Sequence, residues 1–218
     1  MTIRSLFLAL LLAASLAAGA GPAEDFAAGD AAYRQGDVRA AIASLRKAAD
    51  AGHVRAQVLL GSILDAAEQD EEAARYLRMA ADQGDPEGAY LLAALYASGE
   101  GVPIDQARAR QLLEGAAGRG HRESTFALAM AYLGGGLGLT DAERSSPAAL
   151  ATIRKAADLG HLPSLDRLAL AYRNGELGLA ADAKLAADAE SRARSIRGVT
   201  ARTPPPRKRP PARMPGSG

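Results

Sequence analysis

The sequence of 218 residues contains no cysteine and no tryptophan, and aromatic residues make up only 4% of it. Without cysteine the chain can form no disulfide bond, no thiolate metal site and no cysteine nucleophile. With so few aromatic side chains, any core must be built mainly from alanine, leucine and other aliphatic residues. The stability of the fold must therefore come from the packing of aliphatic side chains.

The short motifs that mark common active sites are also missing. The sequence has no Gly-x-Ser-x-Gly, no His-Glu-x-x-His and no phosphate-binding loop. The glycine run at residues 134–136 follows no predicted strand, so we interpret it as a loop between helices. We therefore predict no catalytic residue, no cofactor and no enzymatic activity.

What the chain does contain is a repeated pattern, Ala-Ala-x-x-Gly, which occurs four times. We call the glycines of this pattern the anchor glycines, and they are Gly52, Gly84, Gly120 and Gly160. Successive anchor glycines are 32, 36 and 40 residues apart. A period in this range indicates an array of stacked helix pairs.

Small or aliphatic residues stand at fixed distances before each anchor glycine. They lie eleven, seven and four residues before it. These positions are Ala41, Ala73, Ala109 and Ala149; Leu45, Leu77, Leu113 and Ile153; and Ala48, Ala80, Ala116 and Ala156. Because such offsets share one face of a helix, the pattern predicts an alanine helix with one buried stripe. The glycine should end this helix, since it adopts the left-handed conformation without a Cβ clash.

A second helix is predicted after each anchor glycine. A small residue follows at position four, a leucine at position eight, a small residue at position nine, and leucine or tyrosine at position twelve. These residues are Ala56, Gly88, Ser124 and Ser164; Leu60, Leu92, Leu128 and Leu168; Gly61, Ala93, Ala129 and Ala169; and Leu64, Tyr96, Tyr132 and Tyr172. The spacing of four residues marks one helical face, on which large side chains pack between small ones.

Loops of different lengths join each second helix to the next alanine helix, which explains the uneven period. Three of these loops are rich in glycine, at residues 99–103, 135–139 and 175–179. A shorter unit with Ala28, Gly29 and Tyr33 precedes the first anchor. The sequence thus predicts an all-α fold, an α/α solenoid of about five helix pairs over residues 21–196.

The repeat resembles that of the Sel-one-like family, which is related to the tetratricopeptide repeats. The shared motif is Ala-Ala-x-x-Gly, a small residue at position four, Leu-Gly or Leu-Ala at positions eight and nine, Tyr at position twelve, and then Gly-x-Gly-Val-Pro. Residues 84–120 match it best, whereas the first copy lacks the glycine loop. The resemblance implies an adaptor or scaffold protein without shared catalytic residues. Some exported members of the family staple each repeat with a disulfide, which this chain cannot do.

The first twenty residues have the composition of a signal peptide. Arg4 precedes an apolar run over residues 6–16, and Ala18 and Ala20 fit a cleavage site. We expect residues 1–20 to be removed and the protein to be periplasmic or secreted, without a lipid anchor because cysteine is missing. An uncleaved membrane anchor or a buried helix is the alternative. No later run is apolar over the ~20 residues that a spanning helix needs.

The other end of the chain is basic and rich in proline. From residue 191 to residue 218 there are eight basic residues and no acidic one. Proline opposes helix and charge opposes collapse, so residues 197–218 are predicted to be a disordered tail. Arg207, Lys208 and Arg209 either keep the protein soluble or bind an anionic envelope surface or polymer. Nucleic acid is not an expected partner of an exported protein.

The three histidines, His53, His121 and His161, each follow an anchor glycine directly, and Asp85 takes the same place in the remaining copy. We call this position one. A polar side chain there can accept a hydrogen bond from the free N–H groups of the helix that follows. Equivalent residues on helices ~8–10 Å apart cannot share a metal whose bonds are ~2 Å long. We therefore predict helix capping and no metal site.

Positions three, six, ten and thirteen of the second helices form what we call the outer face, opposite the leucine stripe. In a solenoid we expect this face to line the groove and bind the partner. The residues predicted to do so are Tyr90, Phe126, Met130, Asp166 and Arg173. Aromatic and methionine side chains are favoured at interfaces. The alternative is that the apolar ones belong to the core of a wide helix face.

Taken together, the sequence predicts a non-catalytic periplasmic scaffold that binds another envelope protein through its groove. One alternative is an accessory protein of exopolysaccharide export or envelope assembly, where similar solenoids occur. A second alternative is a penicillin-interacting hydrolase-like enzyme, as suggested for some exported members of the family. The absence of cysteine and of a nucleophile motif argues against that enzyme.

Overall fold

The computed structural model describes residues 21–202, with side chains through residue 198. The described residues form α-helices and no strand, so the predicted all-α solenoid is confirmed. None of the helices within this range is long and apolar enough to cross a bilayer. The predicted signal peptide and residues 203–218 of the predicted tail lie outside the described residues.

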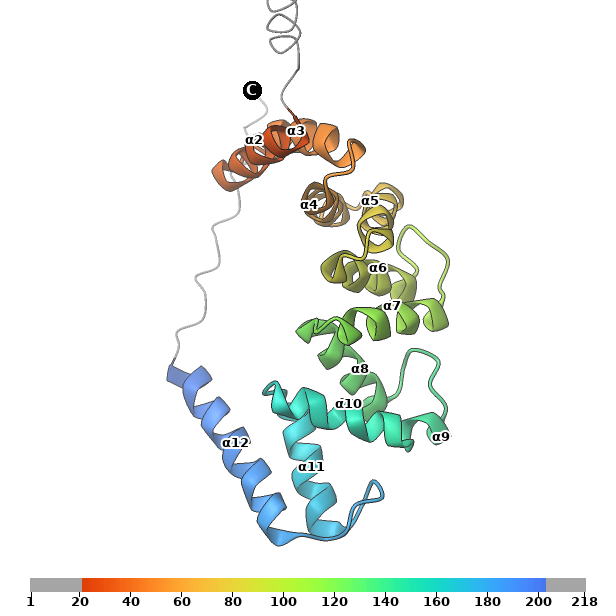
Figure 1. The fold of residues 1–218 in the computed structure, drawn as a ribbon, viewed down its shortest axis with the longest axis vertical. Coiled ribbons are helices and arrows are strands. Elements are labelled where there is room, and N and C mark those ends of the chain that lie inside the picture. The colour runs from red at the N-terminus through yellow and green to blue at the C-terminus, as the bar shows by residue number, and fades with distance from the viewer. Residues whose placement is uncertain (1–20, 203–218) are drawn as a thin grey trace, which may run out of the picture. The chain divides into compact units, whose positions relative to one another are not determined.

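The chain divides after Gln83 into two compact units, and Figure 1 shows the helices of each unit stacked in chain order. Unit 1 contains α2 (Pro22–Gln35), α3 (Val38–Asp50), α4 (Val54–Asp65) and α5 (Asp70–Asp82). Unit 2 contains α6 (Pro86–Ser98), α7 (Gln106–Gly118), α8 (Arg122–Gly134), α9 (Asp141–Arg144), α10 (Pro147–Asp158), α11 (Leu162–Asn174) and α12 (Ala183–Arg202). The second helices are α4, α6, α8 and α11, and the alanine helices are α3, α5, α7 and α10.

The helices begin and end where local chemistry predicts. Ser146 caps α10 by accepting a hydrogen bond from the Ala149 N–H at 3.2 Å, and Pro147 occupies the first helical position. All four anchor glycines have φ angles of 87–88°, the left-handed region in which a side chain would be strained. Each alanine helix therefore stops at the same point of its repeat.

The two predicted stripes form the core of both units. The alanines eleven and four residues before each anchor glycine are 0% exposed, and the four leucines at position eight are at most 6% exposed. Each second helix also packs against the alanine helix that follows it in the chain. In unit 2 this is seen for α6 with α7 and for α8 with α10, and α11 packs in the same way against α12.

Position nine is small because the next alanine helix lies directly against it. A Cβ atom added at Gly61 would lie 2.7 Å from Cγ of Leu77. In the preceding pair, a Cβ atom added at Gly29 would lie 2.6 Å from Cγ of Leu45. Separations below 3 Å are shorter than van der Waals contact, so glycine here sets how closely the helices approach.

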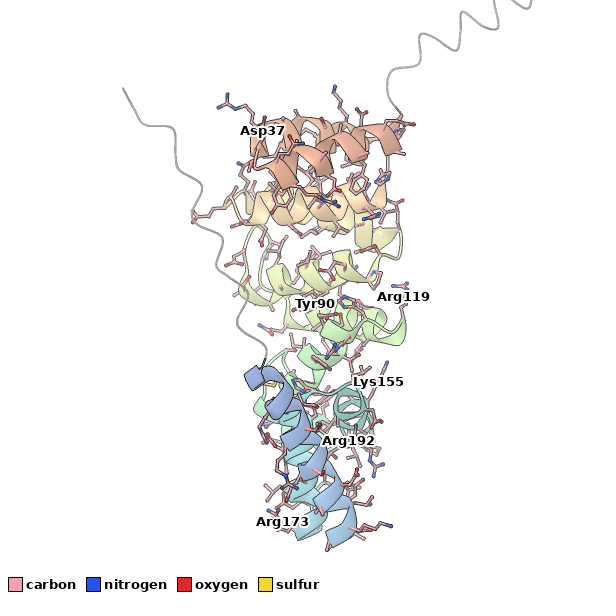
Figure 2. The ribbon with its side chains drawn as sticks, turned by 90° about the vertical axis from the view of Figure 1, so that its left-hand side faces the viewer. Asp37, Tyr90, Arg119, Lys155, Arg173 and Arg192 are labelled. Carbon is pink, nitrogen blue, oxygen red and sulfur yellow. The ribbon has the colours of Figure 1, made fainter. Side chains whose placement is uncertain are left out.

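In unit 2, a basic side chain of α10 and one of α12 each bind the C-terminal end of the preceding alanine helix. Lys155 Nζ donates to the carbonyl of Ala117 at the end of α7, at 2.6 Å. Arg192 of α12 makes the equivalent bond to the carbonyl of Ala157 at the end of α10, at 2.9 Å. Figure 2 labels both residues on the same side of the unit. A positive charge at a helix C-terminus also interacts favourably with the helix dipole.

Two elements differ from the sequence prediction. The short helix α9 was not predicted; Thr140 and Glu143 form a capping box that starts it, and Glu143 pairs with Arg110 of α7 at 3.0 Å. The last helix, α12, continues to Arg202, beyond the predicted end of the solenoid at residue 196. Arg197 stands five residues after Arg192, where α10 has Gly160 five residues after its lysine. Without an anchor glycine, the helix does not stop there.

Candidate interaction surface

The outer face of unit 2 is accessible, as expected for a binding surface. It consists of Glu87, Tyr90, Ala94 and Ala97 on α6; Glu123, Phe126, Met130 and Leu133 on α8; and Pro163, Asp166, Leu170 and Arg173 on α11. Every one of these residues is half-buried or exposed. The face is therefore not part of a continuous core, although its aromatic residues have structural contacts of their own.

Tyr90 packs against its own helix pair and against the next repeat. Its ring contacts the apolar cluster that includes Leu113 and Leu128. It also meets the imidazole of His121, with ring centroids 5.4 Å apart and a tilt of 51°. Tyr90, which Figure 2 labels, thus joins α6 to the start of α8 and keeps only part of its surface accessible.

Phe126 has the corresponding contact one repeat later. Its ring stacks on the imidazole of His161, with centroids 4.6 Å apart and planes at 25°. The guanidinium of Arg122 lies 5.0 Å from the centroid of the same phenyl ring. Unit 1 contains the same arrangement, in which Phe26 stacks on His53 at 4.6 Å and Arg55 lies 5.0 Å from the phenyl centroid.

We call each such aromatic–histidine contact a junction pair. The sequence analysis missed these pairs, yet the sequence carried a signal for them. Where position one is histidine, as at His121 and His161, position six of the preceding repeat is aromatic. Where position one is Asp85, position six of the preceding repeat is Val58. Histidine and an aromatic ring therefore occur together across the repeat boundary.

Helix capping at position one is confirmed in three of the four repeats. Nδ1 of His53 and Nδ1 of His121 each accept a backbone N–H at 3.2 Å, and the carboxylate of Asp85 accepts one at 2.7 Å. His161 differs, because its side chain accepts no backbone hydrogen bond. Its Nδ1 lies 2.8 Å from Oγ of the fully buried Ser164 instead. Within residues 21–198, no group of three or more potential ligands is placed to hold a metal.

Met130 and Leu170 are the exposed large apolar side chains of the outer face. They are 48% and 41% exposed, and both stand at position ten of their repeats. Their helices, α8 and α11, pack against each other. Equivalent positions on packed neighbouring helices present two apolar side chains on one face. Leu170 stands at a position of the predicted outer face but was not among the predicted binding residues.

The predicted charged residues of the surface are already paired within the chain. Asp166 forms an ion pair with Arg197 of α12, and Arg173 forms one with Glu190 of the same helix. Figure 1 shows α12 running beside α11, where it can supply both partners. A partner would have to displace these contacts to use either charge. Arg207, Lys208 and Arg209 of the tail lie outside the described residues, so their role stays a prediction.

No protein-family model and no curated protein matches the sequence. Solved structures do match. A protective antigen present in uropathogenic Escherichia coli strains, which displays an SLR fold, is similar over 83% of this chain, with 27% identity and a TM-score of 0.68. This chain spans only 39% of the length of that antigen.

A Sel1 repeat protein from Oxalobacter formigenes is similar over 79% of this chain and 70% of its own length, with 25% identity and a TM-score of 0.60. MamA covers 80% of this chain with 97% of its own length, at 18% identity and a TM-score of 0.53. At that identity MamA supports the fold alone. The two other similarities agree with the repeat motif read from the sequence.

Proposed function

Because the chain is a Sel1-like repeat protein, we propose that it is a non-catalytic scaffold that binds another envelope protein through the outer face of α6, α8 and α11. Sel1-like and tetratricopeptide-like solenoids are protein-interaction scaffolds in general. The proposal adds the surface, the compartment and the kind of partner. It is supported by the accessible outer face and by the absence of a catalytic motif in the sequence.

The outer face of α8 and α11 is chosen because Met130 and Leu170 are both exposed there, at equivalent positions of two packed helices. Exposed leucine and methionine side chains lose contact with water when a partner covers them, which is favourable. Asp166 and Arg173 of the same face are paired within the chain. The partner segment is therefore expected to be mainly apolar where it covers α8 and α11.

The compartment is part of the proposal. The arginine, the apolar run and the small residues of the first twenty positions support export to the periplasm. Those residues lie outside the described part of the chain. A chain without cysteine is suited to an oxidising compartment such as the periplasm, because it has no thiol that could be oxidised.

The experiment replaces the two exposed anchors together. The double variant Met130→Ala, Leu170→Ala should lose the partner that the unchanged protein captures from envelope extracts. Anchors of this kind often contribute 2 kcal/mol or more, on the order of a thirtyfold loss of affinity. Because both side chains are already exposed, the melting temperature of the variant should stay unchanged within error.

A matched control removes two exposed apolar side chains elsewhere in unit 2. Ile104, in the loop before α7, is 65% exposed, and Leu159, at the end of α10, is 38% exposed. The double variant Ile104→Ala, Leu159→Ala should bind like the unchanged protein. If both double variants bind normally, or if both lose the partner equally, the outer face of α8 and α11 is not the binding surface.

A further inference from the structure

The junction pairs fall into two chemical types. In one type, at Tyr90 and His121, carboxylates surround the imidazole: Nε2 of His121 lies 2.9 Å from Glu87 and 3.4 Å from Glu123. In the other type, at Phe126 and His161, the ring stacks on phenylalanine, and the nearby charge is the guanidinium of Arg122.

His161 has surroundings that disfavour a positive charge. Its imidazole is partly buried between Phe126 of α8 and Ser164 of α11. Burial lowers the pKa of His161 below its ordinary value, because a buried imidazolium loses hydration. Among the described residues, no carboxylate forms an ion pair with His161.

The charged groups of the neighbouring helices are engaged elsewhere. Asp158, at the end of α10, pairs with Arg192 of α12 at 3.3 Å. Asp166 on α11 pairs with Arg197 of α12. On α8, Glu123 stands at the position equivalent to Glu87 but lies 3.4 Å from Nε2 of His121. Among the described residues, these three carboxylates therefore pair with groups other than His161.

The phenyl ring of Phe126 does not offset the cost of burying a charged imidazole. An imidazolium over a phenyl face gains a cation–π attraction. At this junction, however, the guanidinium of Arg122 already lies 5.0 Å from the centroid of Phe126. A second cation on the same ring would be opposed by the first.

From this geometry we propose that the junction between α8 and α11 is a pH-sensitive switch, closed when His161 is neutral and loosened when its imidazole takes up a proton in mildly acidic surroundings. A proton at Nδ1 of His161 would turn this atom from an acceptor into a donor towards Oγ of Ser164, and the charged ring would lose its fit in the partly buried site against Phe126. The inference concerns the fold and needs no partner. It can therefore be tested independently of the proposed function.

Because the pKa of His161 is lowered in the closed junction, acid destabilises the junction. The opened chain binds a proton more readily than the closed junction, so the junction is fully stable above the ordinary pKa of histidine, ~6.5. Its stability is lost as the pH falls below that value towards the lowered pKa of the closed state. At pH 5.5 the opening equilibrium should rise by up to about tenfold relative to pH 7.5, because the opened state is then mostly protonated.

The switch lies beside the proposed binding surface. Phe126 and Met130 are four residues apart and thus neighbours on one face of α8. Met130 lies on α8 and Leu170 on α11, the two helices that this junction joins. If the proposed function holds, acidification should weaken partner binding through this same junction.

The test uses the full-length protein and two variants, His161→Asn and His121→Asn. Asparagine can cap a helix but does not titrate, so each variant removes one proton-binding site. Amide hydrogen exchange of α8 and α11 is followed at pH 7.5 and pH 5.5, after correction for the intrinsic pH dependence of exchange. The imidazole proton resonances of the unchanged protein are titrated by NMR over the same range.

In the unchanged protein, opening at the start of α11 should increase by up to about tenfold at the lower pH, and His161 should titrate below ~6.5. The His161→Asn variant should show no such increase, whereas His121→Asn should keep it. The proposal is overturned if the unchanged protein exchanges equally at both pH values, or if His161→Asn retains the response. Should His161→Asn fail to fold, the NMR titration decides: a value at or above ~6.5 refutes the switch.

Discussion

Replacing Gly61 by alanine tests the close approach of second helices and alanine helices. The new methyl group would lie 2.7 Å from both Cγ and Cδ2 of Leu77, which is 1% exposed. Leu77 cannot swing away, because its Cγ is a branch point near the backbone and its surroundings are filled. Overpacking of this kind costs about 1–3 kcal/mol.

Helix propensity acts in the opposite direction, since alanine in a helix interior is about 1 kcal/mol more favourable than glycine. Gly115 of α7 measures this contribution alone, because a methyl group there would meet no heavy atom within 4 Å beyond its own turn of helix. Gly115→Ala should therefore stabilise its unit by about 1 kcal/mol. Gly61→Ala should range from neutral to about 2 kcal/mol destabilising, the overpacking cost less the propensity gain.

The assay is urea unfolding followed by far-UV circular dichroism, with the slope of each transition compared with that of the unchanged protein. The difference between the two variants isolates the steric cost of about 1–3 kcal/mol. A double-mutant cycle with Leu77→Ala adds a second check, because the smaller side chain should relieve the clash and give a favourable coupling. If Gly61→Ala stabilises as much as Gly115→Ala, the reasoning about position nine is refuted.

The remaining predictions concern the ends of the chain, beyond the described residues. The mature protein isolated from the periplasm should begin close to Gly21, and recovery of Met1 on cytosolic protein would contradict export. Removal of residues 203–218 should leave helix content and melting temperature unchanged. It should weaken association with anionic envelope material, and salt should weaken the same association because exposed charges are screened over ~10 Å at 0.1 M. Equal association of truncated and full-length protein at low salt would limit the tail to a solubilising role.

The core could be predicted because it depends on spacing within single helices. The offsets that place Leu92 and Leu168 on one helical face need no knowledge of neighbouring repeats, and both side chains are buried as expected. The same holds for the ends of the alanine helices, since a glycine at Gly84 or Gly160 determines the backbone locally. The repeat motif and the helical fold could thus be predicted from the sequence.

The binding surface was less predictable, because it depends on how helices cross. Tyr90 and Phe126 were predicted to bind the partner, with a place in the core as the alternative, and each is partly used in a junction pair. Met130 was expected on the surface and is exposed, but its binding role stays a prediction. The pairing of Asp166 with Arg197 could not be foreseen, since the sequence suggested that the solenoid ended at residue 196. The pairing of Arg173 with Glu190 depends on how α11 and α12 cross.

Because of the junction pairs, the effect of deleting one repeat depends on where the deletion begins and ends. Each pair links position six of one repeat to position one of the next and so straddles an anchor glycine. Excision of residues 91–126 would set Tyr90 before His161 and recreate an aromatic–histidine pair. Excision of residues 59–90 would instead set the valine of position six before a histidine and leave the imidazole without a ring. Loss of one repeat by recombination would therefore keep an aromatic–histidine pair in the first case and remove one in the second.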